Sequence, residues 1–413
     1  MKILFFVAKF PCTSETFVLN QVTSMLDRGH DVRIYSWGKG DKSCNHKDIE
    51  KYGLRSKIIY MDMEVPKSHV IRLLKIVPRF LNMLVKYGWK IYRLFLPKYG
   101  HPLLSKNLMQ CYIAQRFLKW SWNPDVIVSH FGDNGIVISS LRNSGVIPQG
   151  IKCLTFFHAH EICRMSIEEV ARFYKPMFND DDILLPINHL WEKKLIKAGA
   201  NPQKIKLLHM GVDLKRFNYV ESNEISDTIN ILSVGRLCGQ KGFEYAINGV
   251  VEFAKKTKKN ISYRIIGEGA LGKKLKTLVE NLEAENYINF LGAQPQQIVA
   301  KEMQKANVFL LPSVTDEDGF MEGIPVAIME AMARGLLCVS TYHSGIPELI
   351  EDGKNGFLCK EKDSTGIAVA LGKIEMLTFD QMNEIRRNAR RIIERDFDVC
   401  KETEKLMNLI EKG

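Results

Sequence analysis

Two cations in the second half of the chain have the type and spacing that suit an anionic ligand. Arg236 and Lys241 lie between an expected strand, Asn230–Gly235, and an expected helix that begins near Phe243. Cations at the positive end of a helix dipole are unfavourable unless an anion lies between them, and that anion would also accept the free backbone N–H groups. The pattern predicts an anion site; two side chains that extend into solvent are the alternative.

Two glutamates follow at a spacing that suits an extended ligand. Glu322 and Glu330 flank Gly323 and Pro325, and the expected helix ends near Arg334. A fully helical segment would place the glutamates about 12 Å apart at a rise of ~1.5 Å per residue, beyond the ~5–9.5 Å of paired glycosidase carboxylates. The spacing instead favours carboxylates that accept hydroxyl groups from different ends of one ligand. Solvated surface glutamates are the alternative.

Two histidines in the first half of the chain each end an expected strand. At such a place His130 and His158 are candidates for orienting a substrate or handling a proton, with a structural, hydrogen-bonded role as the alternative. His160 and Glu161 follow His158, but ligands this close at a strand end do not make a tetrahedral metal site. No metal is therefore expected.

The loop after the first expected strand contains Ser14, Glu15 and Thr16, and a helix is expected over Ser14–Arg28. Hydroxyl groups at a helix N-terminus suit an anion or a sugar hydroxyl. Ordinary capping of the helix by Ser14 is the alternative.

A glycine-rich stretch, Gly267–Gly272, matches G-x-G-x-x-G literally between a strand and a helix. A dinucleotide site also needs an acid after the next strand to bind the ribose, and Leu291–Ala293 offers none. A nicotinamide or flavin site is therefore disfavoured.

Strand-like and helix-like segments alternate along nearly the whole chain. This alternation predicts parallel sheets with helices packed on their faces, and such elements would position the residues described above. Ligands of such folds lie at the carboxyl ends of the strands, so a cleft between two domains is the expected site. The strands are expected at Lys2–Ala8, Asp31–Trp37, Asp125–His130, Lys152–His158, Ile183–Ile187, Lys204–His209, Asn230–Gly235, Ser262–Gly267, Tyr287–Leu291, Val308–Leu311, Leu337–Thr341 and Gly356–Cys359.

The chain is expected to form two Rossmann-like domains in tandem. The first would span residues 1–210, with a basic amphipathic insertion near 65–124. A polar linker would follow at 211–228, and the second domain would span 229–413, ending in helices.

The composition is that of a globular protein. The 413 residues are 46% hydrophobic and 25% charged, which excludes a disordered or collagen-like chain. The nine cysteines contain no C-x-x-C pair, so neither a zinc site nor a disulfide framework is indicated and a reducing compartment is expected. The apolar start is too short for a signal peptide, and no segment has the roughly 18 apolar residues of a membrane span.

Charge is concentrated in residues 65–124, which contain no Asp or Glu and contribute as much positive charge as the net +11 of the chain. Cations interleaved with apolar and aromatic residues are typical of amphipathic helices on anionic lipid. A solvated helical face is one alternative, and a nucleic-acid site, for which no motif is present, is another. The cations are Lys67, Arg72, Lys75, Arg79, Lys86, Lys90, Arg93, Lys98, Lys106, Arg116 and Lys119.

Taken together, the motifs resemble those of the retaining family-4 glycosyltransferases of the GT-B fold. The matching residues are Arg236, Lys241, Gly267, Gly269, Glu322, Glu330 and Ser344–Glu348. Further stretches resemble the exopolysaccharide glycosyltransferases of the colanic acid and amylovoran type. These stretches are Lys9–Pro11, Ser14–Gln21, Met210–Asp213 and Met321–Val326.

The resemblance implies two Rossmann-like domains that face each other across a cleft, and a retaining hexosyltransferase. It implies a UDP- or GDP-sugar donor and a polyprenyl-diphosphate-linked oligosaccharide acceptor in bacterial exopolysaccharide or O-antigen synthesis. The protein would be peripheral on the inner face of the cell membrane, with no metal, no cofactor beyond the donor and no nucleic acid. A sugar-nucleotide epimerase or phosphorylase, or a non-catalytic membrane-surface protein, is the alternative.

The resemblance also implies a role for each site residue. Arg236 and Lys241 would hold the donor diphosphate, and Glu330 would bind the ribose hydroxyls. Glu322, with the backbone of Gly323 and Ile324, would hold the donor sugar, which His158 would contact near its anomeric carbon.

On the acceptor side the chain departs from the family, because Phe10–Glu15 replaces a Gly-Gly turn. Ser14, Glu15, Thr16 and His130 are expected to shape that side.

Overall fold

The structure of the protein is a computed structural model that describes residues 1–413 except 13–14, 41–46, 62–64, 67, 97–98, 100, 102–103, 105, 107, 119–121, 181, 221–224 and 413. The chain divides into two compact units. Unit 1 consists of Met1–Ile187, Trp191–Leu208 and Thr403–Gly413, and unit 2 of Asn188–Leu190 and His209–Glu402.

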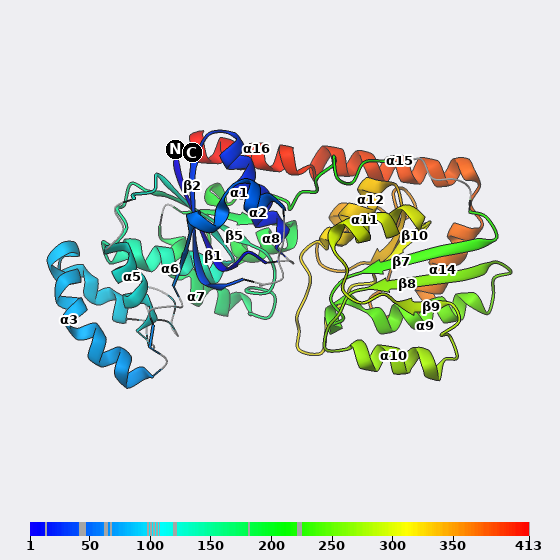
Figure 1. Ribbon diagram of the computed structural model, residues 1–413, viewed down its shortest axis with the longest axis horizontal. Coiled ribbons are helices and arrows are strands. Elements are labelled where there is room, and N and C mark those ends of the chain that lie inside the picture. Colours follow the sequence, from blue (N-terminus) through cyan, green and yellow to red (C-terminus); the bar gives the residue numbers. More distant parts are fainter. Residues whose placement is uncertain are drawn as a thin grey trace. The chain divides into compact units, whose positions relative to one another are not determined.

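Each unit is built on a six-stranded parallel sheet (Figure 1). In unit 1 the order is β3-β2-β1-β4-β5-β6, from β1 (Lys2–Phe10), β2 (Asp31–Lys39), β3 (Ile58–Tyr60), β4 (Val126–His130), β5 (Lys152–Phe157) and β6 (Ile183–Pro186). In unit 2 the order is β12-β11-β10-β7-β8-β9, from β7 (Thr228–Val234), β8 (Asn260–Ile266), β9 (Ile288–Phe290), β10 (Val308–Leu310), β11 (Leu337–Thr341) and β12 (Phe357–Cys359). The predicted fold class, two doubly wound α/β domains, is confirmed.

Helices connect the strands of both sheets (Figure 1). In unit 1 they are α1 (Thr16–Asp27), α2 (Lys47–Lys51), α3 (His69–Tyr87), α5 (Met109–Leu118), α6 (Gly132–Asn143), α7 (Ile167–Phe178) and α8 (His189–Lys197), with short 3-10 turns η1 (Leu54–Lys57), η2 (Trp89–Phe95) and η4 (Pro202–Lys204). In unit 2 they are η5 (Gly239–Lys241), α9 (Phe243–Ala254), α10 (Gly272–Asn281), α11 (Gln296–Lys305), α12 (Val326–Arg334), α13 (Ile346–Leu349), α14 (Ser364–Glu375) and α15 (Phe379–Asp396), followed by α16 (Val399–Lys412). None of the helices in the described ranges has the length and apolarity needed to cross a membrane.

The central strands are apolar because helices cover both faces of a parallel sheet. Every residue of β4 and of β11 is buried. The uninterrupted apolar runs in the sequence therefore predicted these strands correctly.

Two predicted elements differ from the structure. Lys204–His209 was expected to be a strand. It lies along β6, with an isolated bridge between Leu184 and Ile205 and backbone bonds from Lys206 to Leu184 and from Leu208 to Pro186, but it is not a strand of the sheet. The first helix begins at Thr16, so Glu15 and not Ser14 occupies the N-cap, and Glu15 makes no side-chain capping bond. Ser14 itself lies outside the described residues. The short edge strand β3 gave no clear sequence signal, because its three residues are only half-buried.

The strand order reverses once in each sheet, between β1 and β4 and between β7 and β10. At such a switch point the two connecting loops diverge and leave room for a ligand at the carboxyl ends of the strands. The loops at these points contain Glu15, Arg236 and Glu322, and His130 is the last residue of β4. The topology thus places most of the sequence-derived candidates at the two expected binding edges.

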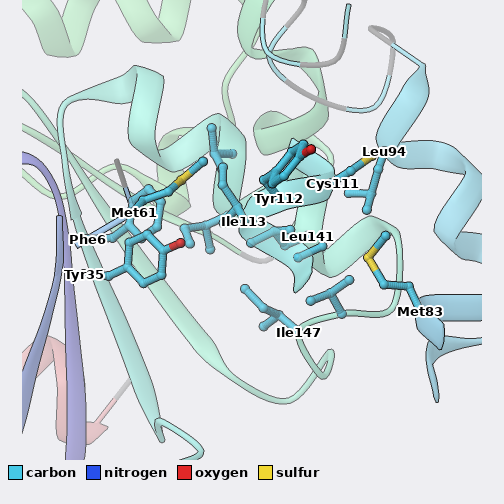
Figure 2. Close-up of a cluster of buried hydrophobic side chains, with 14 of the residues drawn as sticks. Phe6, Tyr35, Met61, Met83, Leu94, Cys111, Tyr112, Ile113, Leu141 and Ile147 are labelled. Atoms are coloured by element: carbon cyan, nitrogen blue, oxygen red, sulfur yellow. The ribbon is translucent and has the colours of Figure 1, made fainter. Parts of the chain in front are cut away.

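The basic insertion of unit 1 is anchored in the hydrophobic core beside the sheet (Figure 2). Met83 from α3, Leu94 from η2 and Cys111 and Tyr112 from α5 pack in one cluster with Phe6 of β1. The insertion therefore folds as part of unit 1.

The last residues of the chain return to unit 1 (Figure 1). Leu406 and Ile410 of α16 are buried, and the Nζ of Lys152 donates to the carbonyl oxygens of Leu409 (3.3 Å) and Ile410 (2.8 Å). The end of α16 is thus a structural part of a unit whose sheet was formed by the beginning of the chain.

Candidate active site

The switch point of unit 2 is built by a close approach of two loops. Gly242 has φ +64°, and a Cβ atom there would lie 2.0 Å from the carbonyl oxygen of Pro312. The backbone N–H of Val314 also donates to the carbonyl of Gln240, at 2.9 Å. Only glycine allows this packing, which brings the N-terminus of α9 against the loop that follows β10.

Lys241 and Glu322 meet at this junction. Lys241 Nζ lies 3.0 Å from Glu322 Oε2, and both side chains are largely shielded from solvent, with 12% and 17% exposure. Arg236, by contrast, is exposed and forms no ion pair within the described part of the chain. The site therefore combines one cation already paired with a carboxylate and a second cation available to an anion.

The backbone beside Glu322 offers hydrogen-bond donors. Gly323 and Ile324 are buried, and the carbonyl of Gly323 accepts from the N–H of Gly345 at 3.2 Å. Within the described ranges, the N–H groups of Gly323 and Ile324 have no acceptor. Because buried N–H groups are normally paired, these two are suited to a bound ligand.

Glu330 lies in the second turn of α12. Burial raises the pKa of Glu330 to about 7, although a hydrogen bond from Gln296 Nε2 (3.3 Å) and the positive charge of Arg216 favour its ionised form. Since α12 begins at Val326, Glu322 lies in the preceding loop, and the helical estimate of the distance between the two glutamates does not apply.

In unit 1, the switch point brings His130 and His158 together. His130 Nδ1 lies 3.1 Å from His158 Nε2, and His130 Nε2 lies 3.1 Å from Gln21 Oε1 on α1. If Nε2 of His130 donates to Gln21, its Nδ1 must accept from His158, so the chain of bonds fixes the tautomer of both rings.

The histidine pair is enclosed by aromatic rings and is neutral. Phe17 lies 4.8 Å and Phe131 4.5 Å from the ring of His158. Burial lowers the pKa of His158 to about 3, and burial together with His158 lowers the pKa of His130. Phe131 has φ +73°, which is a strained conformation for a bulky residue and is typical of functional sites.

The side chain of Glu161 binds the backbone that follows β4 and β5. Its carboxylate accepts the backbone N–H groups of His158 (2.8 Å), Ala159 (3.2 Å) and Gly132 (3.3 Å). Burial nevertheless raises the pKa of Glu161 to about 7. This carboxyl group holds the loop of His158.

The remaining candidates of the first loop lie at the start of α1. Glu15 and Thr16 are half-buried there. Phe17 and Gln21, on the same helix, reach the histidines, and sequence reasoning had not assigned them a role. Their i, i+4 spacing was the available signal, because it places both on one helix face.

The glycines of the G-x-G stretch allow two loops to pack closely against each other. A Cβ atom at Gly267 would lie 1.9 Å from the carbonyl oxygen of Gly235, and one at Gly269 would lie 2.5 Å from that of Leu237. The backbone N–H of Leu237 also donates to the carbonyl of Glu268. The stretch therefore positions the loop of Arg236, which explains the motif without a dinucleotide.

Comparison with known proteins identifies the family of the chain. The family described as "Glycosyl transferases group 1" matches residues 215–392. The glycosyltransferase WcaL of Salmonella typhimurium, named for colanic acid biosynthesis, is 38% identical over 403 residues, which cover 96% of each chain. The amylovoran biosynthesis glycosyltransferase AmsK of Erwinia amylovora is 38% identical over 372 residues, 90% of each chain. The chain belongs to this glycosyltransferase family.

Solved glycosyltransferase structures share its fold. HepE of Anabaena, in complex with UDP and glucose, has a TM-score of 0.72 at 16% identity, with both chains fully covered. WaaG, involved in lipopolysaccharide biosynthesis, has a TM-score of 0.63 at 17% identity, again over both whole chains. The family match spans Arg236, Lys241, Glu322 and Glu330, whereas His130 and His158 lie in the part that only the full-length relatives cover.

Proposed function

We propose that this glycosyltransferase transfers a hexosyl group, with retention of configuration, from a UDP- or GDP-sugar to a lipid-linked oligosaccharide. The bond between the anomeric carbon and the diphosphate oxygen breaks, and a bond to the acceptor hydroxyl oxygen forms on the same face. The acceptor's proton goes to the departing diphosphate. The observation that carries the proposal is the Lys241–Glu322 pair beside the exposed Arg236 at the switch point of unit 2.

Each residue that we assign to the nucleotide-sugar site has a role that follows from its surroundings. Arg236 and Lys241 hold the diphosphate and stabilise the charge that grows on it as it leaves. The carboxylate of Glu322 and the N–H groups of Gly323 and Ile324 bind the sugar hydroxyls, and Glu330 binds the ribose.

His158, neutral and oriented by His130, contacts the sugar near its anomeric carbon. The acceptor side is formed by the loop of Ser14, Glu15 and Thr16 with His130.

We further propose that no metal takes part, because two cationic side chains replace it at the diphosphate. The rate of transfer should therefore be the same with and without EDTA.

The acceptor is proposed to be a polyprenyl-diphosphate-linked oligosaccharide, so the enzyme would work on the inner face of the membrane in exopolysaccharide or O-antigen synthesis. Helix α3 supports this location. Only Ile76 and Met83 of α3 are buried, whereas Leu74 is 69% and Val85 88% exposed. Val70, Leu74, Val77, Leu81 and Val85 recur at three- and four-residue intervals and so share one face of the helix.

The cations of α3 lie on another side of the helix. Lys75 is exposed, as is Lys90 after the helix, whereas Arg79 faces α5, with its guanidinium 5.3 Å from the ring of Tyr112. An exposed apolar helix face in a basic segment without acidic residues fits an anionic lipid surface better than it fits water.

Vesicle sedimentation tests the membrane proposal. We expect the triple variant Leu74→Gln, Leu81→Gln, Val85→Gln to bind phosphatidylglycerol vesicles several-fold more weakly. Neutralising Lys75, Arg79, Lys86 and Lys90 should have the same effect, and in both variants nucleotide binding should persist. Val369→Gln with Met376→Gln, at exposed positions of unit 2, is the matched control. Unchanged vesicle binding by both α3 variants would refute the proposal.

Thermal unfolding with UDP, GDP, ADP and NAD tests the donor site. A nucleotide at 100 times its Kd should stabilise the protein by about 2.7 kcal/mol. We expect UDP or GDP to raise the Tm, and Arg236→Ala and Glu330→Ala to abolish that rise. Lys273→Ala removes an exposed cation of α10 and should keep it. If no nucleotide raises the Tm, even with anionic vesicles present, the donor site is wrongly assigned.

A further inference from the structure

A buried histidine outside the residues assigned above is bonded to the backbone of Glu322. His343, two residues after β11, is fully buried, and its Nε2 lies 3.0 Å from the backbone nitrogen of Glu322. A peptide N–H can only donate, so Nε2 must be the unprotonated nitrogen of this ring. The tautomer of His343 is therefore fixed by the backbone it contacts.

The proton of the ring must then lie on Nδ1, which faces a carboxylate. Nδ1 lies 2.6 Å from Glu361 Oε1, and Glu361 Oε2 accepts the backbone N–H of Thr315 at 2.7 Å. Burial alone would raise the pKa of Glu361, but the hydrogen bonds from Thr315 and His343 together lower it, so the group is an ionised acceptor.

The carboxylate of Glu361 thus holds the loop after β10 at two points. Glu361 binds the loop directly at Thr315 and, through His343, at Glu322. The backbone bond between Gly345 and Gly323 adds a second tie immediately after Glu322. The ends of the loop are held, and the side chain of Glu322 can turn toward Lys241.

We propose that His343, braced by Glu361, is the positioning residue for Glu322 and its neighbouring N–H groups. The inference rests on the proposed role of Glu322 at the donor sugar. It predicts a larger effect on turnover than on nucleotide affinity, because Arg236 and Glu330 still hold the nucleotide when Glu322 and its partner Lys241 shift. A displacement of about 1 Å in a positioned group can cost up to ~100-fold in rate.

Two substitutions of similar size separate the hydrogen bond from the packing. In His343→Gln the amide oxygen can take the place of Nε2 and accept from Glu322. In His343→Met the volume is kept but no strong acceptor is present. We expect kcat to fall about tenfold or more in His343→Met and less than about threefold in His343→Gln, with the donor KM within about twofold in both.

A readout that does not depend on activity is hydrogen exchange at the amide of Glu322. Exchange should accelerate in His343→Met and stay slow in His343→Gln, while the Tm rise with UDP or GDP persists. Should the His343 variants fail to fold, Glu361→Gln tests the same link. Its single amide oxygen can satisfy either Thr315 or His343 but not both, so kcat should fall with KM unchanged.

The outcomes distinguish this inference from the proposed function. If His343→Met and His343→Gln have equal kcat and equal exchange, the positioning role is wrong, whatever Glu322 does. If Glu322→Ala itself keeps full turnover, the assignment of Glu322 fails and the inference fails with it. Loss of turnover in Glu322→Ala together with full turnover in His343→Met and Glu361→Gln overturns the inference alone.

Discussion

At the scale of single residues, the carboxyl group of Glu330 links donor binding to pH. The ionised form accepts two ribose hydroxyls, whereas the protonated form is a poorer acceptor. Because burial raises its pKa to about 7, ionisation is completed only as the pH rises through neutrality. We expect the donor KM to fall several-fold between about pH 6 and pH 8.

Initial rates at a series of donor concentrations and pH values measure this effect. In Glu330→Gln the donor KM should be higher and independent of pH over that range. Glu317→Gln, at an exposed position of the loop after β10, is the control and should behave as the unmodified protein. A pH dependence that survives in Glu330→Gln would have another source.

Ionisation of the Glu330 carboxyl favours donor binding but lowers the stability of the folded protein. A carboxyl whose pKa is raised by folding binds more protons in the native state than in the unfolded state at intermediate pH. The free energy of unfolding therefore decreases as the pH rises from the ordinary glutamate range to about 7. Glu330 is thus a residue at which function at neutral pH opposes stability.

At the scale of elements, Gly267 determines how the loops after β7 and β8 pack. A methyl group there would lie 1.9 Å from the carbonyl of Gly235, at a φ of +146°. We expect Gly267→Ala to lower the free energy of unfolding by about 1–3 kcal/mol. It should also weaken nucleotide binding, because the loop of Arg236 shifts. Urea denaturation and nucleotide titration measure the two effects.

A second glycine of the same unit provides the control. Gly372 lies inside α14, and a Cβ atom there would meet nothing within 4 Å. Gly372→Ala should therefore stabilise the protein by about 0.5–1 kcal/mol and leave nucleotide binding unchanged. Equal effects of the two substitutions would contradict the role assigned to Gly267.

At the scale of the whole molecule, the end of the chain stabilises its beginning. Leu406 and Ile410 are buried in unit 1, although they follow the last element of unit 2 in sequence. We expect Leu406→Ala with Ile410→Ala to accelerate hydrogen exchange in β1, β4 and β5 and to leave β7 and β10 unchanged. Faster exchange confined to unit 2 would contradict the assignment.

The amino-acid sequence by itself determined the two α/β sheets and the residue types at their binding edges. Strands buried on both faces appear as apolar runs, and glycines with polar residues mark the loops between them, so both signals are local. Arg236 and Lys241 could be singled out for the same reason, since both lie a few residues after such a run, and Glu322 was singled out by its spacing from Glu330 at the start of an expected helix.

Only the tertiary structure decided which distant residues meet. Gln21 and His130 are 109 residues apart, and the bonds from Glu361 to Thr315 and His343 also join separate loops. The false strand at Lys204–His209 has a related cause, because its few backbone bonds to β6 do not continue into the regular ladder that defines a strand. The tautomers of His130, His158 and His343 and the return of Thr403–Gly413 to unit 1 likewise depend on contacts made in three dimensions.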